Sequence, residues 1–260
     1  MILTSLKKKI KQVVPKFFWE KLRILKFIGK KLPDFEIYQN AVRGKSGVEI
    51  GGPSLAFKTI LPIYQVINNL DGVNFSLNTI WEGSIQSGKT FKYFKKNVGE
   101  QYVSEATNLD LINSESYDFL LSSNCLEHVA NPFQAIEEWK RVIKPNGFML
   151  LVLPNKNSNF DHNRAVTTFQ HLLEDFNNGT TEADLTHLEE ILTLHDLSRD
   201  IQAGDYENFK SRSLDNLSNR GLHHHVFDMQ LLYKIFDYFG LMVCHSMECK
   251  SDYYILGMKK

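Results

Sequence analysis

The sequence predicts an α/β fold built on a doubly wound, mostly parallel sheet. Three observations support this: short apolar segments alternate with helical segments, a tight glycine turn follows the first apolar segment, and residues 117–122 form an apolar run. Apolar strands of this kind suit a sheet that helices cover on both faces. Strands and helices in alternation imply parallel strands joined by crossover helices. At 260 residues the chain suits one domain with an insertion.

Composition argues against several classes of protein. Lys plus Arg number 30 and Asp plus Glu number 30, so nucleic acid is not predicted as the main partner. The three cysteines, Cys125, Cys244 and Cys249, lack the spacing of a zinc site and are expected to be reduced thiols of a cytoplasmic protein. No apolar run reaches the length of a membrane span, and residues 1–5 lack the apolar region of a signal peptide.

The first 44 residues differ from the rest of the chain. Residues 1–32 are rich in Lys and Arg, with Glu20 as the one acid, and apolar residues are interleaved. We predict a basic amphipathic helical arm over 1–44. Residues 1–32 either contact an anionic membrane or pack on their own domain or on a second subunit, and packing is favoured because amphipathicity usually reports core contacts. The packing alternative therefore includes a homo-oligomer.

Elements of the main domain, residues 45–260, follow in order. Strands are expected at about 47–50, 65–70, 101–104, 117–122 and 148–153, with a closing pair at 241–247 and 253–258. A helix opens at Asn131 with Pro132 in its first turn. A later helix is capped by Asp228 and ends at Gly240. Residues 155–220 interrupt the alternation with helices near 168–176 and 182–194, and are too long for a bare loop, so we predict an inserted subdomain or lid.

Small and polar residues follow the ends of the first four predicted strands: Glu49, Gly51 and Gly52; then Asp71; then Glu105 and Ala106; then Asn124. Because the carboxyl ends of parallel strands meet at one edge of a sheet, these residues describe a cleft. Asp71 follows Glu49 by 71 − 49 = 22 positions. This is the spacing of the acid that binds ribose hydroxyls in nucleotide-binding α/β folds.

Four stretches resemble the class I S-adenosylmethionine-dependent methyltransferases, especially the methyltransferase type 11 group. They are VEIGG at 48–52, EATNL at 105–109, YDFLL through LEHV at 117–129, and RVIKPNGF at 141–148. The resemblance covers about residues 45–154 and 222–258. It implies a seven-stranded Rossmann-like sheet with an antiparallel last strand, and S-adenosyl-L-methionine as cofactor. It also implies cofactor contacts: Glu49, Gly51 and Gly52 at the methionine, Asp71 at the ribose, Glu105 and Ala106 at the adenine, and Asn124 near the sulfonium.

Most of the nine histidines follow the fifth predicted strand, on the side where an acceptor would meet the cofactor. His162 and His224 are predicted as catalytic residues, because histidine suits a base near neutral pH. Arg164, His223 and His225 are predicted to bind the acceptor, with Arg164 suited to an anionic group.

The remaining histidines of the insert are interpreted as structural. His171, His187 and His195 lie on predicted polar helices and are expected to be surface or capping residues. A metal site formed by His223 and His225 with Asp161 or Asp196 is an alternative. No known metal-binding spacing supports it, so no metal is predicted.

The function that these features favour is a methyltransferase that O-methylates a small or glycan-like acceptor, including a phosphorylated one. One alternative is a non-catalytic module that binds the cofactor or assembles with partners. Another is a nicotinamide-dependent oxidoreductase, which the missing G-x-G-x-x-G pattern and the closing pair of strands oppose.

Overall fold

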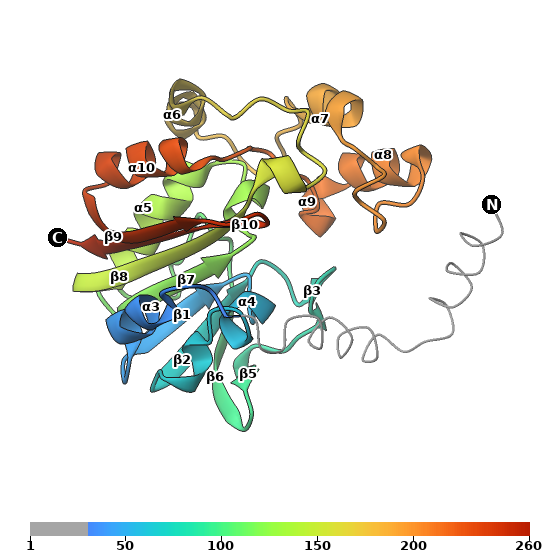
Figure 1. Cartoon of the computed structure of the whole chain (residues 1–260). Coiled ribbons are helices and arrows are strands. Elements are labelled where there is room, and N and C mark those ends of the chain that lie inside the picture. Colours follow the sequence, from blue (N-terminus) through green and yellow to red (C-terminus); the bar gives the residue numbers. More distant parts are fainter. Residues whose placement is uncertain (1–30) are drawn as a thin grey trace.

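An eight-stranded sheet lies at the centre of the computed structural model, which describes residues 31–260 (Figure 1). The strands run in the order β5-β6-β2-β1-β7-β8-β10-β9. Their bounds are β1 Ser46–Ile50, β2 Asn69–Asn74, β5 Gly88–Phe94, β6 Asn97–Val103, β7 Tyr117–Ser123, β8 Ile143–Pro154, β9 Leu241–Glu248 and β10 Asp252–Lys259. Strands β6, β2, β1, β7 and β8 are parallel, and β5, β9 and β10 each pair antiparallel with their neighbours. The predicted fold class is confirmed.

Helices cover both faces of the sheet, as its apolar strands require (Figure 1). Neighbouring residues of β7 point to opposite faces: Leu120 belongs to one core cluster, and Phe119 and Leu121 belong to the other. The first cluster includes buried residues of α5 (Pro132–Val142) and α10 (Met229–Tyr238). The second includes those of α3 (Phe35–Val42) and α4 (Leu55–Lys58).

Helices α5 and α10 begin where the sequence predicts. The Asn131 side chain accepts a hydrogen bond from the Gln134 N–H at 3.1 Å, and Pro132 occupies the first turn. Asp228 accepts from the Leu231 N–H at 2.8 Å in the same way. Gly240 follows the end of α10 with φ +66°, a conformation that glycine adopts without strain.

The segment between β1 and β6 departs from the predicted alternation. Residues 63–65 form a 3-10 helix (Ile63–Gln65), and β2 starts at Asn69, four residues later than expected. Within the described residues 75–96 there is no helix. Two short strands, β3 (Asn78–Thr79) and β4 (Gly83–Ser84), are followed by β5, which forms a hairpin with β6. The sheet therefore gains one edge strand beyond the seven expected.

The insert forms a layer of helices beside the carboxyl ends of the parallel strands (Figure 1). It contains η3 (Lys156–Ser158), α6 (Phe169–Asn178), α7 (Leu188–Leu194), α8 (Tyr206–Leu214) and α9 (Asn216–Asn219). The start of α6 is as predicted, α7 is shorter than expected, and α8 and α9 were not anticipated. A small core of its own includes Ile191, Ala203, Phe209 and Leu222.

The end of the predicted basic arm packs as part of the main domain. Tyr38 and Val42 of α3 are fully buried, and the Leu32 N–H bonds the Ile60 carbonyl at 2.9 Å. The domain boundary predicted at residue 45 is therefore too late. Residues 1–30 of the predicted arm lie outside the described residues. Among the residues that the structure describes, no helix is both long enough and apolar enough to cross a membrane.

Candidate active site

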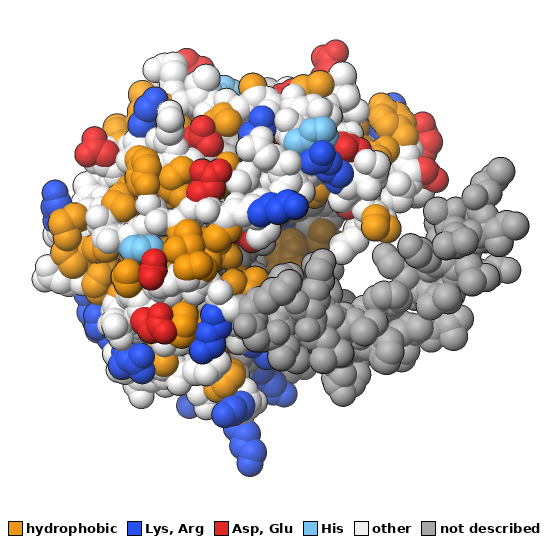
Figure 2. Space-filling view, in the orientation of Figure 1, with side chains coloured by type: hydrophobic (Ala, Val, Ile, Leu, Met, Phe, Trp, Pro, Cys, Tyr) orange, Lys and Arg blue, Asp and Glu red, His pale blue; other side chains and the backbone are white. Residues whose placement is uncertain are grey.

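The carboxyl ends of β1, β2, β6 and β7 meet at one edge of the sheet and face the insert (Figure 1). Figure 2 shows that the surface is hollowed on this side, with hydrophobic side chains at the bottom of the hollow. Ligands of open α/β sheets bind outside the carboxyl ends of the strands. A ligand-binding site is therefore expected at this edge.

A glycine turn follows β1 and needs both of its glycines. Gly51 has φ +78°, and a Cβ there would lie 3.1 Å from the Sγ of Cys125. A Cβ on Gly52 would lie 2.2 Å from the carboxyl carbon of Glu49, closer than any real contact. The turn can thus pass close to β7 and over Glu49 only because both side chains are absent.

Glu49 lies beneath this turn and has no exposed surface. Its carboxylate accepts hydrogen bonds from the Ser54 N–H at 3.0 Å, the Ser54 hydroxyl at 2.5 Å and the Tyr64 hydroxyl at 2.6 Å. Burial raises the pKa of Glu49 to about 7, against the lowering effect of these hydrogen bonds. The predicted cofactor contact of Glu49 is replaced here by contacts that hold the turn in shape.

Asp71 does not lie at the carboxyl edge, contrary to the sequence prediction. It is the third residue of β2, and its carboxylate accepts from the Glu100 N–H at 2.8 Å and the Tyr117 hydroxyl at 2.7 Å. Tyr117 is the first residue of β7, so these bonds belong to the amino half of the sheet. The error arose because the 3-10 turn of residues 63–65 was read as the start of the strand.

Asn74 ends β2 at the place predicted for Asp71. Its Nδ2 donates to the Gly52 carbonyl at 3.0 Å, and its Oδ1 accepts from Trp81 Nε1 at 3.1 Å. Phe75 follows it, beside the glycine turn. Sequence reasoning missed both residues, although the parallel pairing of Ile50 with Val73 places them directly beyond the strand end.

Glu105 and Ala106 follow β6 and reach the edge as predicted. Arg220, from the insert, donates to Glu105 at 2.6 Å, and its guanidinium lies over the Phe75 ring at 4.8 Å from the centroid. Arg220 also lies 3.6 Å from Glu182. The Phe75 face and the Glu105 carboxylate are thus both in contact with one arginine.

Asn124 follows β7 and is exposed at the same edge, with φ +49°. The edge therefore combines a glycine turn, an aromatic face at Phe75, a carboxylate at Glu105 and an exposed amide at Asn124. These are the kinds of group that an adenosine-containing cofactor requires. The residues fit such a ligand when the Arg220 guanidinium moves off the Phe75 ring.

The two predicted catalytic histidines are engaged within the insert. His162 Nε2 lies 2.9 Å from the Asp196 carboxylate. His224 is 1% exposed, its Nε2 lies 3.0 Å from Asn216 Nδ2, and burial lowers its pKa to about 4. His224 is therefore a buried structural residue. The sequence does not reveal this, because His224 stands in a run of three histidines between Leu222 and Val226.

Arg164 joins the two ends of the insert rather than facing an acceptor. It is 2% exposed, and each of its three nitrogens bonds a protein group. Nη1 donates to Asp161 at 3.1 Å and to the His223 carbonyl at 2.7 Å. Nη2 donates to the His224 carbonyl at 3.1 Å, and Nε donates to Glu190 at 3.2 Å. These bonds use four of the five N–H groups of a side chain that is 2% exposed, so the predicted contact with an anionic acceptor is not seen here.

Directly after Asn124, the loop that follows β7 meets the end of the insert in a cluster of titratable side chains. His223 Nδ1 lies 2.5 Å from the Asp161 carboxylate, and the ring of His128 lies 4.5 Å from that of His223. Glu127 is 1% exposed, and neither of its carboxylate oxygens has a hydrogen-bond partner. One donor atom from each of Glu127, His128 and His223 lies within 4.8 Å of the others, so these three side chains could also hold a metal ion.

The surroundings set the charges in this cluster. Burial alone would lower the pKa of His223, but the Asp161 carboxylate raises it above its usual value. Burial raises the pKa of Glu127 to about 7, and burial together with the neighbouring His223 lowers that of His128 to about 3. The His128 Nδ1 faces the Leu222 carbonyl at 2.9 Å, so the lone pair is on Nε2. Of this cluster, the sequence singled out only His223 and Asp161.

His225 lies apart from this cluster. Its Nε2 is 3.1 Å from the Ala130 carbonyl and 3.7 Å from Asp175, and its side chain is 1% exposed. Together with His171 and His187 it belongs to a second group that could hold a metal ion. His171 and His187, expected to be surface or capping residues, are in contact with each other at 2.9 Å, and His187 is the N-cap residue of α7.

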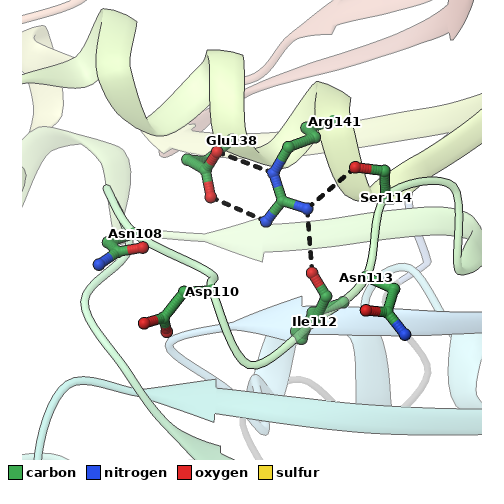
Figure 3. A pocket seen from close by; sticks show the side chains of 7 residues that line it. All are labelled: Asn108, Asp110, Ile112, Asn113, Ser114, Glu138 and Arg141. Carbon is green, nitrogen blue, oxygen red and sulfur yellow. Dashed lines mark hydrogen bonds and ion pairs between the residues drawn. The ribbon is translucent and has the colours of Figure 1, made fainter.

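Two surface hollows lie elsewhere and carry no such chemistry. The first, of about 360 Å³, is framed by Arg141, which bonds Glu138 and the Ile112 carbonyl (Figure 3). The second, of about 480 Å³, includes Asp71 and Lys89 in its lining. In the first, Arg141 and Glu138 are paired with each other, which indicates a structural role for them.

Comparison with known proteins identifies the class. Residues 72–151 match the family model of the methyltransferase domain. This segment runs from β2 to β8 and so includes the strand ends that build most of the edge. The chain carries a methyltransferase domain, and the resemblance to S-adenosylmethionine-dependent methyltransferases is confirmed.

Individual relatives are distant. The chain is 24% identical over 118 residues to the ubiquinone biosynthesis O-methyltransferase of Haemophilus ducreyi, which covers 45% of this chain and 48% of that protein. The match thus spans about half the length of that relative. A SAM-dependent methyltransferase from Aquifex aeolicus aligns at TM-score 0.47 and 15% identity, covering 97% of this chain and 98% of that one. One from Mesorhizobium loti aligns at TM-score 0.48 and 13% identity, covering 87% and 96%.

Proposed function

We propose that the protein is an S-adenosylmethionine-dependent methyltransferase that methylates a hydroxyl group of a small or glycan-like acceptor. The observation that carries this proposal is the methyltransferase-domain match over β2 to β8, the same segment that supplies Phe75, Glu105 and Asn124 to one edge. The distant relative with an O-methyltransferase name supports oxygen as the methylated atom.

The cofactor is held by the edge residues in this proposal. The backbone of the turn at Gly51 and Gly52 would hold the methionine part, Phe75 would hold the adenine, and Glu105 would bond a polar group of the nucleoside. When bound, S-adenosylmethionine supplies an electrophilic methyl group on a positively charged sulfur. Glu49 and Asn74 act indirectly, because they hold the glycine turn that the ligand contacts.

The acceptor side is assigned to His223 in place of His162 and His224. Asp161 holds Nδ1 of His223 at 2.5 Å, which orients the ring and leaves Nε2 as the proton acceptor. His223 takes the hydroxyl proton as the acceptor oxygen bonds the methyl carbon and the sulfur–methyl bond breaks. Asp161 stabilises the imidazolium that results. Positioning of the acceptor contributes at least as much to the rate.

The charges of this cluster favour an uncharged acceptor over a phosphorylated one. Asp161 is a carboxylate, burial raises the pKa of Glu127 to about 7, and four of the five N–H groups of Arg164 bond protein groups. A phosphate beside Asp161 and the partly ionised Glu127 would meet like charge in a poorly solvated site. The acceptor class is therefore a neutral hydroxyl compound.

Calorimetric titration with S-adenosylhomocysteine and with NAD, followed by transfer of labelled methyl groups to a panel of sugars and phenols, tests the proposal. We expect S-adenosylhomocysteine to bind, NAD not to bind, and Glu105→Ala to weaken binding by about tenfold or more, the usual loss for a charge-assisted hydrogen bond. Binding without transfer to any acceptor would favour the non-catalytic module. NAD binding alone would favour an oxidoreductase.

Adding Mg²⁺ distinguishes a metal-dependent reaction from one in which His223 is the base. If His223 acts as a base, Mg²⁺ leaves turnover unchanged. Turnover that requires Mg²⁺ would instead assign Glu127, His128 and His223 to a catalytic ion.

A further inference from the structure

Four side chains from three separate segments meet at the junction of the insert and the main domain. His171 and Asp175 lie one turn apart on α6, His187 caps the start of α7, and His225 precedes α10. One donor atom from each of the four lies within 4.8 Å of the others. The group shares no residue with the Glu127, His128 and His223 cluster.

The separations of the donor atoms agree with a tetrahedral metal site. His171 Nε2 lies 2.9 Å from His187 Nε2 and 3.2 Å from Asp175 Oδ2. Zinc bonds of 2.0–2.1 Å in a tetrahedron place the ligand atoms about 3.3–3.4 Å apart. Both separations lie slightly below that spacing. His225 Nε2 donates to the Ala130 carbonyl at 3.1 Å, so Nδ1 is the nitrogen of this ring that has a lone pair for an ion.

His171 and His187 share one hydrogen bond, and two other polar atoms of the group have none. Oδ2 of Asp175 and Nδ1 of His225 are buried and have no hydrogen-bond partner. Buried polar atoms in proteins are almost always paired, so two such atoms in one group indicate a missing partner.

Neighbouring groups orient the four side chains. Oδ1 of Asp175 accepts from the Thr180 hydroxyl at 3.0 Å, and Nδ1 of His187 lies 3.6 Å from the Glu190 carboxylate. The backbone N–H of His225 bonds the Glu127 carbonyl at 3.4 Å. Contacts of this kind fix ring orientation around metal ions and raise the basicity of the ligands.

We propose that His171, Asp175, His187 and His225 bind a divalent first-row transition metal, zinc in particular, which fastens α6 and α7 of the insert to the segment that leads into α10. Four protein ligands make a closed, structural site. Three imidazoles and one carboxylate favour zinc over magnesium or calcium, which prefer oxygen ligands. The His171 side chain is 35% exposed and that of His225 is 1% exposed, so the ion enters from the solvent side of α6. The proposal is independent of the reaction proposed above.

Zinc binding to the full chain, freed of metal with a chelator, tests the site. Competition against a chromogenic chelator should show one strong zinc site that His171→Ala and Asp175→Asn weaken at least about 100-fold. Zinc at a hundredfold excess over its Kd should raise the Tm of the unsubstituted chain by about 5–10 °C and leave that of the two variants unchanged.

His128→Ala is the matched control, because it removes a histidine donor from the other cluster and should retain zinc at full affinity. Circular dichroism of the metal-free variants checks that they fold. If Asp175→Asn does not fold, His171→Ala still tests the site, because His171 is partly exposed. Absence of strong binding, or unchanged binding by both variants, overturns the proposal. Loss of zinc in His128→Ala alone would move the ion to the other cluster.

Discussion

At the scale of single residues, the protonation of His223 depends on Asp161. The carboxylate raises the pKa of the buried imidazole above the value that burial alone would give. Turnover should therefore rise with pH as His223 loses its proton. Asp161→Asn should move this rise to lower pH and reduce the maximal rate, because the ring is no longer oriented. Initial rates between pH 5 and 9 provide the measurement, and an unmoved profile would remove Asp161 from this role.

Replacing His223 itself gives a direct test of the base. His223→Ala should lower turnover by about 10²–10⁴-fold, the usual contribution of a general base. Affinity for S-adenosylhomocysteine should stay the same, because the ring lies on the acceptor side. His162→Ala is the control, since its side chain pairs with Asp196 within the insert and should leave the rate near that of the unsubstituted chain. Equal rates in both variants would contradict the assignment.

Glu49 makes stability depend on pH. Its folded-state pKa is raised from 4.5 to about 7, so the folded protein binds a proton more tightly than the unfolded chain does. This contribution is fully present below pH 4.5 and is lost as pH rises through 7. Glu49→Gln removes it, so between pH 5 and 8 the stability of the variant relative to the unsubstituted chain should improve by about 2–3 kcal/mol. Urea unfolding at the two pH values checks this, and a constant difference would contradict it.

Some site residues could be predicted from the sequence because local spacing determines their place. Gly51, Gly52, Glu105 and Asn124 each follow directly after a parallel strand, and such strand ends share one edge. Arg164 also bonds Glu190, His223 and His224, which are 26, 59 and 60 positions away, and no local pattern encodes these contacts. The sequence could therefore suggest a cofactor edge but not which histidine meets it.

At the scale of elements, the end of the insert lies across the cofactor edge through Arg220. Its guanidinium contacts both the Phe75 ring and Glu105, the groups assigned to the nucleoside. An adenine that stacks on Phe75 must displace it. Arg220→Ala should therefore strengthen S-adenosylhomocysteine binding about fivefold, the sum of a modest ion pair and a cation–π contact. Calorimetry measures the change.

Arg199→Ala is the control for this experiment, because Arg199 pairs with Asp196 on the same insert at 3.3 Å. Its affinity should match that of the unsubstituted chain. Weaker binding in Arg220→Ala would instead make the arginine a ligand contact.

Elements with strong local signals were predictable, and those chosen by tertiary contacts were not. Helices α5, α6 and α10 carry caps and apolar stripes that mark their ends. The start of β2 was misplaced because apolar residues 63–67 suit a strand as well as the turn that they form. The β5–β6 hairpin interrupts the predicted alternation of strands and helices, since the buried Phe91 and Tyr93 stand on either side of the exposed Lys92 at the strand period.

At the scale of the whole molecule, the basic residues 1–32 give a test with vesicles. If they contact membranes, the chain should sediment with anionic vesicles at low salt and be released at high salt, because the attraction is screened. Replacing Lys7, Lys8 and Lys9 by Gln should weaken sedimentation, and neutral vesicles should not bind. No sedimentation at low salt would leave packing or self-association as the role of this segment.

The added strand β5 also makes the two ends of the sheet unlike each other. Lys89 and Lys92 are exposed along β5, and the exposed Lys95 follows it directly, so a second copy approaching this edge would bring like charges together. The opposite end is β9, where Met242 and Val243 are exposed at 43% and 36% and carry no charge. Growth of the sheet from molecule to molecule is therefore opposed by repulsion at β5, and β9 is the edge at which a destabilised chain would begin to aggregate.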